Sequence, residues 1–417
     1  MKKNVWFINQ YITTPDIEGE GYRHYYIAKY LNAKTEYKPL LITASFAHAP
    51  QRHNRFRGLY KYVAVEVPTL ILKVNKYKIS GGLGRILNWI FFTLGLFLLP
   101  FISKKKVPKP DIIILSSLPI LPVVNLMFFK LLYPRCKLVF EIRDLWPLSA
   151  IEFGGYSEDN LFIRFLGILE KWAYSNADLV ISVLPRADVH IKQVLNHSNF
   201  NYQWITNGYS LSEDNPNMDL GDVISTPISE EDFKVAYAGT LVVANPLDTV
   251  IEVVRASEKK NLKLYILGGG PEKERLQELA NGNDKIVFIN KIPKQYVAAF
   301  LKKMDLLFMG KGFKNSKVYE FGTSQLKTFD YFNAKKPIIQ ALSSKENPVT
   351  YSGAGYVIEP EDAAQLSQKL EYFTSLDKKK LREYGIKGYN YLIENCTYEV
   401  INKKFHLTLR SLEEKEF

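Results

Sequence analysis

Lys327 and Asp330 stand three residues apart, and of all the patterns in this sequence their residue types and spacing indicate a chemical role most clearly. A glycine turn at Gly322 precedes them, so we expect a helix to begin beyond it, with Thr323 or Ser324 as its N-cap. That helix would carry Lys327 and Asp330 on one face. A cation for phosphate and a carboxylate for ribose hydroxyls, beside the free N–H groups of a helix start, suit a nucleotide-sugar. The alternative is a surface ion pair between the two side chains.

Glycine-rich turns follow three further predicted strands. Glycine lets the backbone approach a ligand closely, and open α/β sheets bind ligands beyond the carboxyl ends of their strands. The turn after strand 262–267 lacks the G-x-G-x-x-G spacing, which makes a nicotinamide dehydrogenase less plausible. For the first turn, an ordinary tight turn remains the alternative. The turn residues are Gly19 and Gly21 after strand 5–9, Gly239 and Thr240 after strand 234–238, and Gly268 after strand 262–267.

Arg143 and Asp144 close the buried strand predicted at 137–144, and Trp146-Pro147 follows. An arginine there could hold a phosphate oxygen, and an aspartate could orient a substrate hydroxyl. The alternative is that the two pair with each other or cap the next segment.

Strands and helices alternate along both halves of the chain, which predicts an α/β fold of two doubly wound, Rossmann-like domains facing a central cleft. The polar segment between Asn207-Gly208 and Phe233 is the expected seam. We therefore predict a first domain over 1–206, with the tail 396–417 packing back on it, and a second over 207–395.

Composition limits the function classes. The chain has 417 residues and a net charge of +12, which points to an acidic partner. Two cysteines exclude a disulfide framework, six histidines contain no H-E-x-x-H, and we expect no metal site. The N-terminus does not read as a signal peptide, so we expect a cytoplasmic protein.

The stretch 86–102 breaks the α/β pattern because it holds no charge over 17 residues. Arg85 precedes it, and three lysines from Lys104 follow. Three interpretations stay open: a buried helix, a helix lying on anionic lipid, and a spanning helix, the last being hard to place inside an α/β domain.

Together these motifs resemble the retaining glycosyltransferases of family 4, which have the GT-B fold. More narrowly, the chain is similar to the N-acetyl-L-fucosamine transferases of O-antigen and capsule synthesis, over nearly its whole length. The residues that carry the resemblance are Ile8–Tyr11, Arg23-His24, Pro110-Asp111, Phe140–Pro147, Asn207-Gly208, Gly268–Pro271, Lys327–Tyr331 and Lys336–Ile339.

The resemblance implies that the second domain binds a sugar nucleotide, usually a UDP-sugar, and the first the acceptor. It implies that Lys327 and the amides of Ser324 and Gln325 hold the diphosphate, that Asp330 binds the ribose, and that Lys291 and Ile292 flank the base. The expected donor set also includes Gly19, Gly21, Gly239, Thr240, Gly268 and Thr323; Arg23, His24, Trp89, Phe92, Lys104 and Lys105 are expected at the acceptor or the membrane.

The chain departs from the family pattern at three places. The first acidic position is Gly322, so Glu320 is the candidate substitute; Arg143 stands where most members have histidine. The loop 241–245 has no cation, so Lys311, Lys317 or Lys327 must offset the diphosphate charge. The expected catalytic residues are Arg143, Asp144 and Glu320.

We expect a retaining transferase, peripheral on the inner face of the cytoplasmic membrane, that needs no cofactor or metal. It would move an N-acetylated (deoxy)hexosamine from a UDP-sugar to a polyprenyl-diphosphate-linked glycan. Two alternatives stay open: a sugar-nucleotide epimerase of GT-B shape, and, on charge alone, a nucleic-acid-binding protein, although no basic-aromatic motif supports the latter.

Overall fold

The computed structural model describes residues 2–18, 22–47, 52–53, 55–78, 82–211, 218–221, 223–224 and 228–414. The chain divides into two compact domains, Met1–Thr206 with Tyr398–Phe417, and Asn207–Thr397. The sequence-based division placed the same boundary after residue 206 and returned the tail from residue 396.

The first domain is built on an eight-stranded sheet in the order β10-β9-β8-β7-β1-β2-β6-β5, parallel except for the β5–β6 pair. Its strand interiors are apolar because both faces are covered by helices. The strands are β1 (Lys3–Ile8), β2 (Tyr37–Ala44), β5 (Tyr60–Val63), β6 (Thr69–Leu72), β7 (Ile112–Ser116), β8 (Lys137–Ile142), β9 (Leu179–Ser182) and β10 (Tyr202–Trp204); β3 (Phe46–Ala47) and β4 (Arg52–His53) form a separate hairpin.

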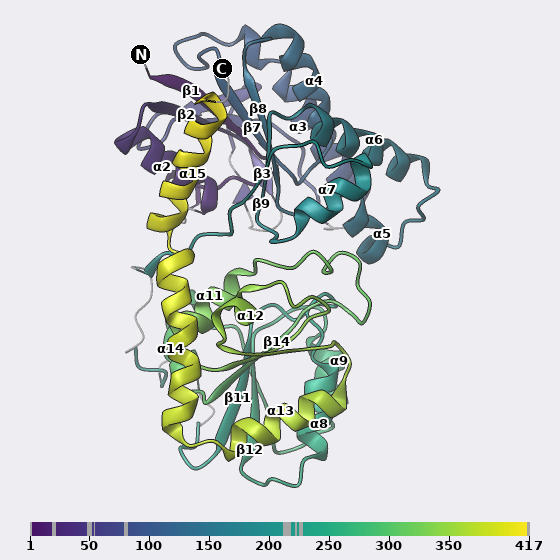
Figure 1. Cartoon of the computed structure of the whole chain (residues 1–417), viewed down its shortest axis with the longest axis vertical. Coiled ribbons are helices and arrows are strands. Elements are labelled where there is room, and N and C mark those ends of the chain that lie inside the picture. The colour runs from purple at the N-terminus through teal and green to yellow at the C-terminus, as the bar shows by residue number, and fades with distance from the viewer. Residues whose placement is uncertain are drawn as a thin grey trace. The chain divides into compact units, whose positions relative to one another are not determined.

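Two helix layers sandwich this sheet (Figure 1). On one face α2 and the C-terminal α15 pack against alternate strand residues such as Phe7, which stacks on Phe405. On the other face Trp6 meets Phe129 of α4 edge to face. The helices are α1 (Pro15–Glu18), α2 (Arg23–Lys34), α3 (Leu83–Leu96), η1 (Leu99–Phe101), α4 (Val123–Leu132), α5 (Leu148–Gly154), α6 (Leu161–Asn176), α7 (Ala187–Leu195) and α15 (Tyr398–Glu414).

The second domain has a six-stranded, fully parallel sheet in the order β13-β12-β11-β14-β15-β16. The sequence predicts these six strands at 234–238, 262–267, 285–290, 305–309, 337–342 and 356–358. Their bounds are β11 (Phe233–Ala238), β12 (Leu262–Leu267), β13 (Ile286–Ile289), β14 (Leu306–Gly310), β15 (Ile338–Ala341) and β16 (Gly355–Ile358); the helices are α8 (Asp248–Ala256), α9 (Lys273–Ala280), α10 (Lys294–Lys302), α11 (Leu326–Asn333), α12 (Pro348–Ser352), α13 (Ala363–Ser375) and α14 (Lys378–Asn395).

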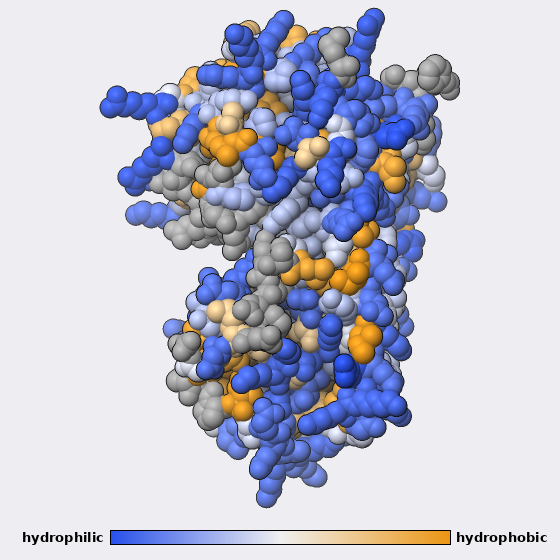
Figure 2. All heavy atoms as spheres, turned by 90° about the vertical axis from the view of Figure 1, so that its left-hand side faces the viewer, coloured by the Kyte–Doolittle hydropathy of each residue, from blue (hydrophilic) through white to orange (hydrophobic). Residues whose placement is uncertain are grey.

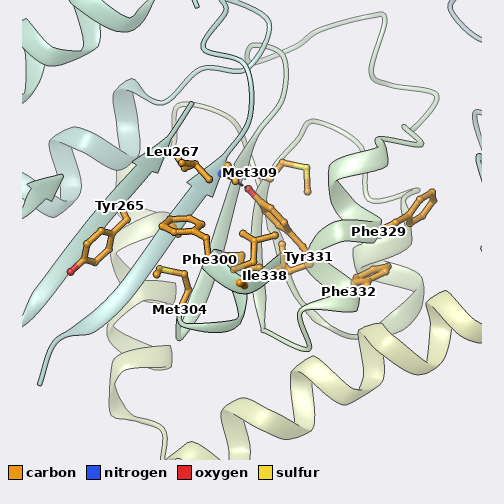
Figure 3. Close-up of a cluster of buried hydrophobic side chains, with 14 of the residues drawn as sticks. Tyr265, Leu267, Phe300, Met304, Met309, Phe329, Tyr331, Phe332 and Ile338 are labelled. Atoms are coloured by element: carbon orange, nitrogen blue, oxygen red, sulfur yellow. Dashed lines mark hydrogen bonds between the residues drawn. The ribbon is translucent and has the colours of Figure 1, made fainter. Parts of the chain in front are cut away.

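Alternate residues of these strands enter two cores. On one face Tyr265, Met309 and Ile338 join Phe300 of α10, and Phe329 and Phe332 extend the core from α11 (Figure 3). On the other face α8, α9 and α13 cover Val235 and Tyr237. The sheet therefore holds α11 in a fixed position at the carboxyl ends of β11 and β14.

Candidate donor and acceptor sites

Helix α11 begins at Leu326, and its N-cap is Gln325, whose side chain makes no capping bond. The expectation that the side chain of Thr323 or Ser324 caps this helix was wrong. The Ser324 hydroxyl instead accepts a hydrogen bond of 3.0 Å from the Asn207 N–H, and its carbonyl accepts one of 2.8 Å from the Asn207 amide. These bonds bind the start of the domain to the turn before α11.

The side-chain amide of Gln325 has an unusual environment. Its oxygen and nitrogen are both buried, and neither bonds to any residue in the part of the chain that the structure describes. Leaving buried polar atoms without partners costs about 1–3 kcal/mol, so such a group at a helix start indicates a ligand or ordered water. Gln325 was expected to contribute only its backbone; the structure adds its side chain to the candidate site.

Lys327 does not behave as one half of a surface ion pair. Its Nζ donates a hydrogen bond of 2.9 Å to the Tyr237 hydroxyl and lies 4.4 Å from the centre of that ring. Burial lowers the pKa of Lys327 to about 7; the charge of Lys311 also lowers it, whereas Asp330 raises it. A buried amine that lacks a full counter-charge is suited to receiving an anion.

Lys327 and Lys311 both approach the turn that follows β11. A Cβ added to Gly239 would come within 2.8 Å of the Lys327 Nζ. Lys311 contacts Asn245 of the same loop at 3.5 Å and lies over the ring of Tyr319 at 4.9 Å. The loop itself lacks a cation, so these two lysines supply positive charge beside it; Lys317 is exposed.

The glycines of the two neighbouring turns serve packing. Gly239 donates its N–H to Leu267, and Gly268, with φ 151°, approaches so closely that a Cβ would lie 1.9 Å from the Gly239 carbonyl. A Cβ added to Gly270 would likewise lie 2.1 Å from the Leu241 carbonyl oxygen. Contact between the two loops therefore explains the need for glycine at 268 and 270, whereas the sequence analysis assigned Gly268 to ligand approach.

The other expected donor residues lie at the same edge of the second domain or outside the described residues. Thr240 is exposed, although its carbonyl accepts the Tyr237 hydroxyl. Lys291 is exposed and Ile292 buried in the loop after β13. Glu320 is exposed just before the Gly322 turn. Gly19 and Gly21 lie outside the described residues.

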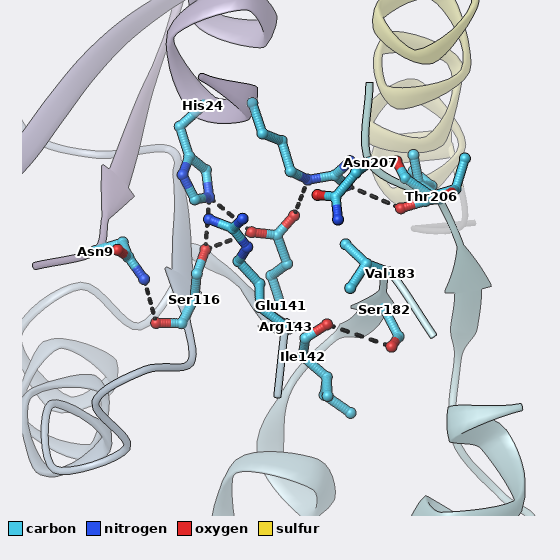
Figure 4. A network of polar contacts seen from close by, with 12 residues as sticks. Asn9, His24, Ser116, Glu141, Ile142, Arg143, Ser182, Val183, Thr206 and Asn207 are labelled. Atoms are coloured by element: carbon cyan, nitrogen blue, oxygen red, sulfur yellow. Dashed lines mark hydrogen bonds and ion pairs between the residues drawn. The ribbon is translucent and has the colours of Figure 1, made fainter. Parts of the chain in front are cut away.

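The first domain holds a buried ionic cluster at the carboxyl ends of β7 and β8 (Figure 4). The Glu141 carboxylate accepts bonds from Arg23 at 2.9 Å, His24 at 2.7 Å and Ser116 at 2.5 Å. Burial lowers the pKa of His24, so the ring donates to Glu141 as a neutral imidazole. Arg23 and His24 together hold the pKa of Glu141 well below its usual range despite burial.

The expected acceptor contacts of Arg23 and His24 need correction. Arg23 is 2% exposed and also donates to the carbonyls of Ile205 and Thr206, and His24 is 3% exposed. Their buried side chains therefore stabilise the first domain just below the carboxyl ends of its strands. Sequence reasoning missed Glu141, although a glutamate in the apolar run of β8 was the available signal.

Arg143 and Asp144 follow β8 directly, and the Ser117 hydroxyl accepts the N–H of Arg143 at 3.1 Å. Figure 4 shows Arg143 beside His24, Ser116 and the Glu141 carboxylate. Arg143 is therefore a partly exposed cation at the strand ends, next to the buried cluster.

The residues expected at the membrane divide in two. Trp89 and Phe92 are buried, at 4% and 0% exposure, and therefore cannot touch lipid. Lys104 and Lys105 are exposed after η1. Among the described residues, no group of three or more His, Cys, Asp or Glu is arranged to hold a metal ion.

One known family matches the second domain. Residues 223–391, which make up most of the second domain, match the family model for group 1 glycosyl transferases. The second domain is a group 1 glycosyltransferase domain. This match supports the expected class, a retaining glycosyltransferase of family 4 that uses a nucleotide-sugar donor.

Solved structures of low sequence identity share the fold of this chain. Sucrose-phosphate synthase from Thermosynechococcus elongatus superposes with a TM-score of 0.72 at 14% identity, over 100% of both chains. Anabaena Alr3699/HepE in complex with UDP gives 0.63 at 14% identity, over 99% of this chain and 100% of that one. No curated protein sequence matches significantly. The expected GT-B fold is confirmed.

Proposed function

We propose that this glycosyltransferase moves an N-acetylated, often deoxygenated, hexosamine from its UDP-sugar to a polyprenyl-diphosphate-linked glycan in O-antigen or capsule synthesis. The observation that carries the donor half is the Lys327 cradle: a buried, weakly basic amine on Tyr237 beside the Gly239 turn and the start of α11. A diphosphate supplies the negative charge that this cradle lacks.

Uridine is the base we propose. Similar folds with 10–14% identity include Alr3699/HepE in complex with UDP and an E. coli protein bound with UDP-2-fluoro glucose. In our proposal Gln325 and the amides of α11 bind the diphosphate with Lys327, and Asp330 on the same helix binds the ribose. Lys291 and Ile292 follow β13 and flank the base.

The chemistry we propose depends on stabilising a leaving group. When the sugar–phosphate bond breaks, the nucleoside diphosphate gains negative charge, which Lys327, Lys311 and helix N–H groups offset. The leaving phosphate itself takes the acceptor proton, so no strong base or metal is required. Arg143 holds the acceptor's phosphate or the developing charge, Asp144 orients a hydroxyl, and Glu320 contacts the donor sugar.

A thermal-shift series tests the donor half. UDP and UDP-N-acetylhexosamines should raise the melting temperature, whereas ADP and GDP should not, because the base pocket selects uridine. Lys327→Met should weaken UDP binding by about tenfold or more, the loss of one charge-assisted contact. Lys302→Met, on the exposed face of α10, is the matched control and should bind normally. Equal response to all nucleotides would reject the uridine assignment.

A product assay tests the transfer half. The protein, a UDP-N-acetylhexosamine and a polyprenyl-diphosphate-linked sugar should give a lengthened lipid-linked glycan and UDP, with the donor's anomeric configuration kept. Donor alone should remain unchanged. Formation of an epimerised sugar nucleotide without acceptor would instead establish the epimerase alternative.

A further inference from the structure

Helix α3 exposes one apolar stripe although it is packed into the first domain. Leu87, Ile90, Phe91 and Leu94 occupy helical positions i, i+3, i+4 and i+7, and between 39% and 56% of each is exposed. Leu83 continues the stripe by one turn at the helix start. Four or five large apolar side chains on one solvent-facing side are unusual for a soluble surface.

The opposite side of α3 excludes a membrane-spanning role. Within the described residues, Leu83–Phe101 is the one segment long and apolar enough to cross a bilayer by length and composition. Yet Asn88 is fully buried and bonds to Gln10 and to the Asn75 carbonyl, and Phe92 is fully buried. Spanning would expose these polar groups to hydrocarbon and remove Phe92 from the core.

A second stripe lies on α6, in the same helix layer. Leu161, Phe165 and Ile168 repeat at i, i+4 and i+7 and are exposed. Helix α4 packs against both α3 and α6 and exposes Leu131 and Leu132 at its end. The layer of α3, α4 and α6 (Figure 1) thus presents apolar side chains from three neighbouring helices. We call these residues, with Leu83, the α3–α6 surface.

Positive charge is concentrated around α3 and α4, whereas the exposed Glu158 and Asp159 just before α6 are acidic. Residues 67–140, which run from before β6 to the middle of β8, contain eleven Lys and Arg and one acidic residue, Asp111. Lys104, Lys105 and Lys106 follow η1 directly, and Lys130 and Arg135 flank the exposed end of α4. This segment accounts for most of the chain's net charge of +12.

The other face of the first domain differs. Seen from the side of α2 and α15, the molecule is mainly hydrophilic, and apolar residues form small separate groups (Figure 2). On α15 the exposed Leu407 has no apolar neighbour at i±3 or i±4 that is itself exposed. The large apolar stripes are therefore a property of the α3–α6 layer.

We propose that the α3–α6 surface docks on an anionic bilayer, with both stripes in the interfacial region and the lysines at the headgroups. Apolar area on one helix layer and positive charge beside two of its helices, α3 and α4, are the two features that interfacial binding needs. The proposal deepens the proposed function, because a lipid-linked acceptor lies at such a surface, but the docking itself requires no donor. It also replaces Trp89 and Phe92 as the lipid contacts.

Vesicle sedimentation of the full chain without donor tests this. The protein should bind phosphatidylglycerol–phosphatidylethanolamine vesicles, bind phosphatidylcholine vesicles weakly, and be released by salt. Changing Ile90, Phe91 and Leu94 together to Ser should weaken partition by about tenfold or more. The same changes at Leu161, Phe165 and Ile168 should have a comparable effect, while Leu407→Ser should have none.

The unfolding transition of the first domain, measured by calorimetry in the same preparations, separates loss of docking from loss of the fold, and the UDP thermal shift reports on the donor site of the second domain. Lys104, Lys105 and Lys106 changed together to Gln should weaken binding to anionic vesicles only. Unchanged sedimentation of both triple-Ser variants would overturn the proposal. So would a wild-type protein that ignores vesicles but forms dimers that the same variants dissociate, because the surface would then contact a second copy.

Discussion

At the residue scale, Lys327 links donor binding to pH. With its pKa lowered to about 7 by burial, the free amine is largely neutral above that pH. A bound diphosphate favours the protonated form, so binding takes up a proton. The Tyr237 hydroxyl accepts the hydrogen bond of Lys327, the charge of Lys311 lowers the pKa of Lys327 further, and Asp330 raises it.

We therefore predict that UDP affinity falls as pH rises above about 7, by at most about tenfold per pH unit. Below that pH the lysine is already charged and the affinity should level off. Calorimetric titrations in buffers of different ionisation enthalpy measure both the affinity and the protons taken up. Lys327→Arg should bind with little pH dependence, because arginine stays protonated. A wild-type affinity that is flat between about pH 6 and about pH 9 would contradict the lowered pKa.

In the first domain, the buried carboxylate of Glu141 links stability to pH. It holds Arg23 and His24, so removing the charge leaves Arg23 buried and without its counter-charge. We predict that Glu141→Gln destabilises the first domain by about 3–5 kcal/mol in urea unfolding at neutral pH. Because the folded pKa of Glu141 is lowered, its contribution is present above the unfolded pKa of about 4 and is lost as pH falls further.

Exposed Glu158 provides the control, since Glu158→Gln should leave the unfolding midpoint unchanged. Equal stability of Glu141→Gln and the wild type would mean that the cluster is not ionic.

At the element scale, two turns of the second domain depend on each other. A Cβ at 268 would lie 1.9 Å from the Gly239 carbonyl, whereas one at 269 would meet nothing within 4 Å. We predict that Gly268→Ala costs about 2–4 kcal/mol of stability and weakens UDP binding, because the Gly239 turn must move. Gly269→Ala should stay within about 0.5 kcal/mol of the wild type. Chemical denaturation and UDP titration of both variants check this; identical behaviour would contradict the packing argument.

How far the sequence predicts each element depends on whether its signal is local. The apolar runs at Ile112–Ser116 and Ile338–Ala341 predict buried parallel strands, because a continuous apolar run needs cover on both faces. The antiparallel pairing of β5 and the hairpin of β3 and β4 depend on distant partners and left no comparable pattern.

The candidate sites show the same limit. Lys327 and Asp330 were readable because their spacing on a helix is fixed. The hydrogen-bond partner of Lys327, Tyr237 on β11, comes from another strand and could not be inferred from spacing. Lys311 was a candidate cation in the sequence, but its proximity to Lys327 was not predictable from it. The family resemblance places Arg23 and His24 at the acceptor or the membrane, but their residue types are equally compatible with a structural role. Only the buried Glu141, 118 residues from Arg23, decides between them.

At the scale of the whole molecule, the chain's last helix belongs to its first domain. On α15, Ile401, Phe405, Leu409 and Leu412 enter the core that holds Phe7 and Ile27. Tyr398 stacks on Tyr26 at 4.1 Å, and Glu413 bonds to Lys3 and Tyr37. The first domain is therefore complete only after the second has been synthesised.

Removal of Tyr398–Phe417 tests this arrangement. Burying four large apolar side chains contributes about 6–12 kcal/mol, which is comparable to the total stability of a domain. We predict that the truncated protein loses the unfolding transition of its first domain but still binds UDP, because the second domain has its own cores on both faces of its sheet. Phe405→Ala should lower the first transition by about 3–5 kcal/mol, whereas Leu407→Ala, on the exposed side of α15, should not. Calorimetry with and without UDP distinguishes the transitions, since the nucleotide should raise only the one that belongs to the second domain. A truncated chain with both transitions intact would show that α15 is not required to complete the first core.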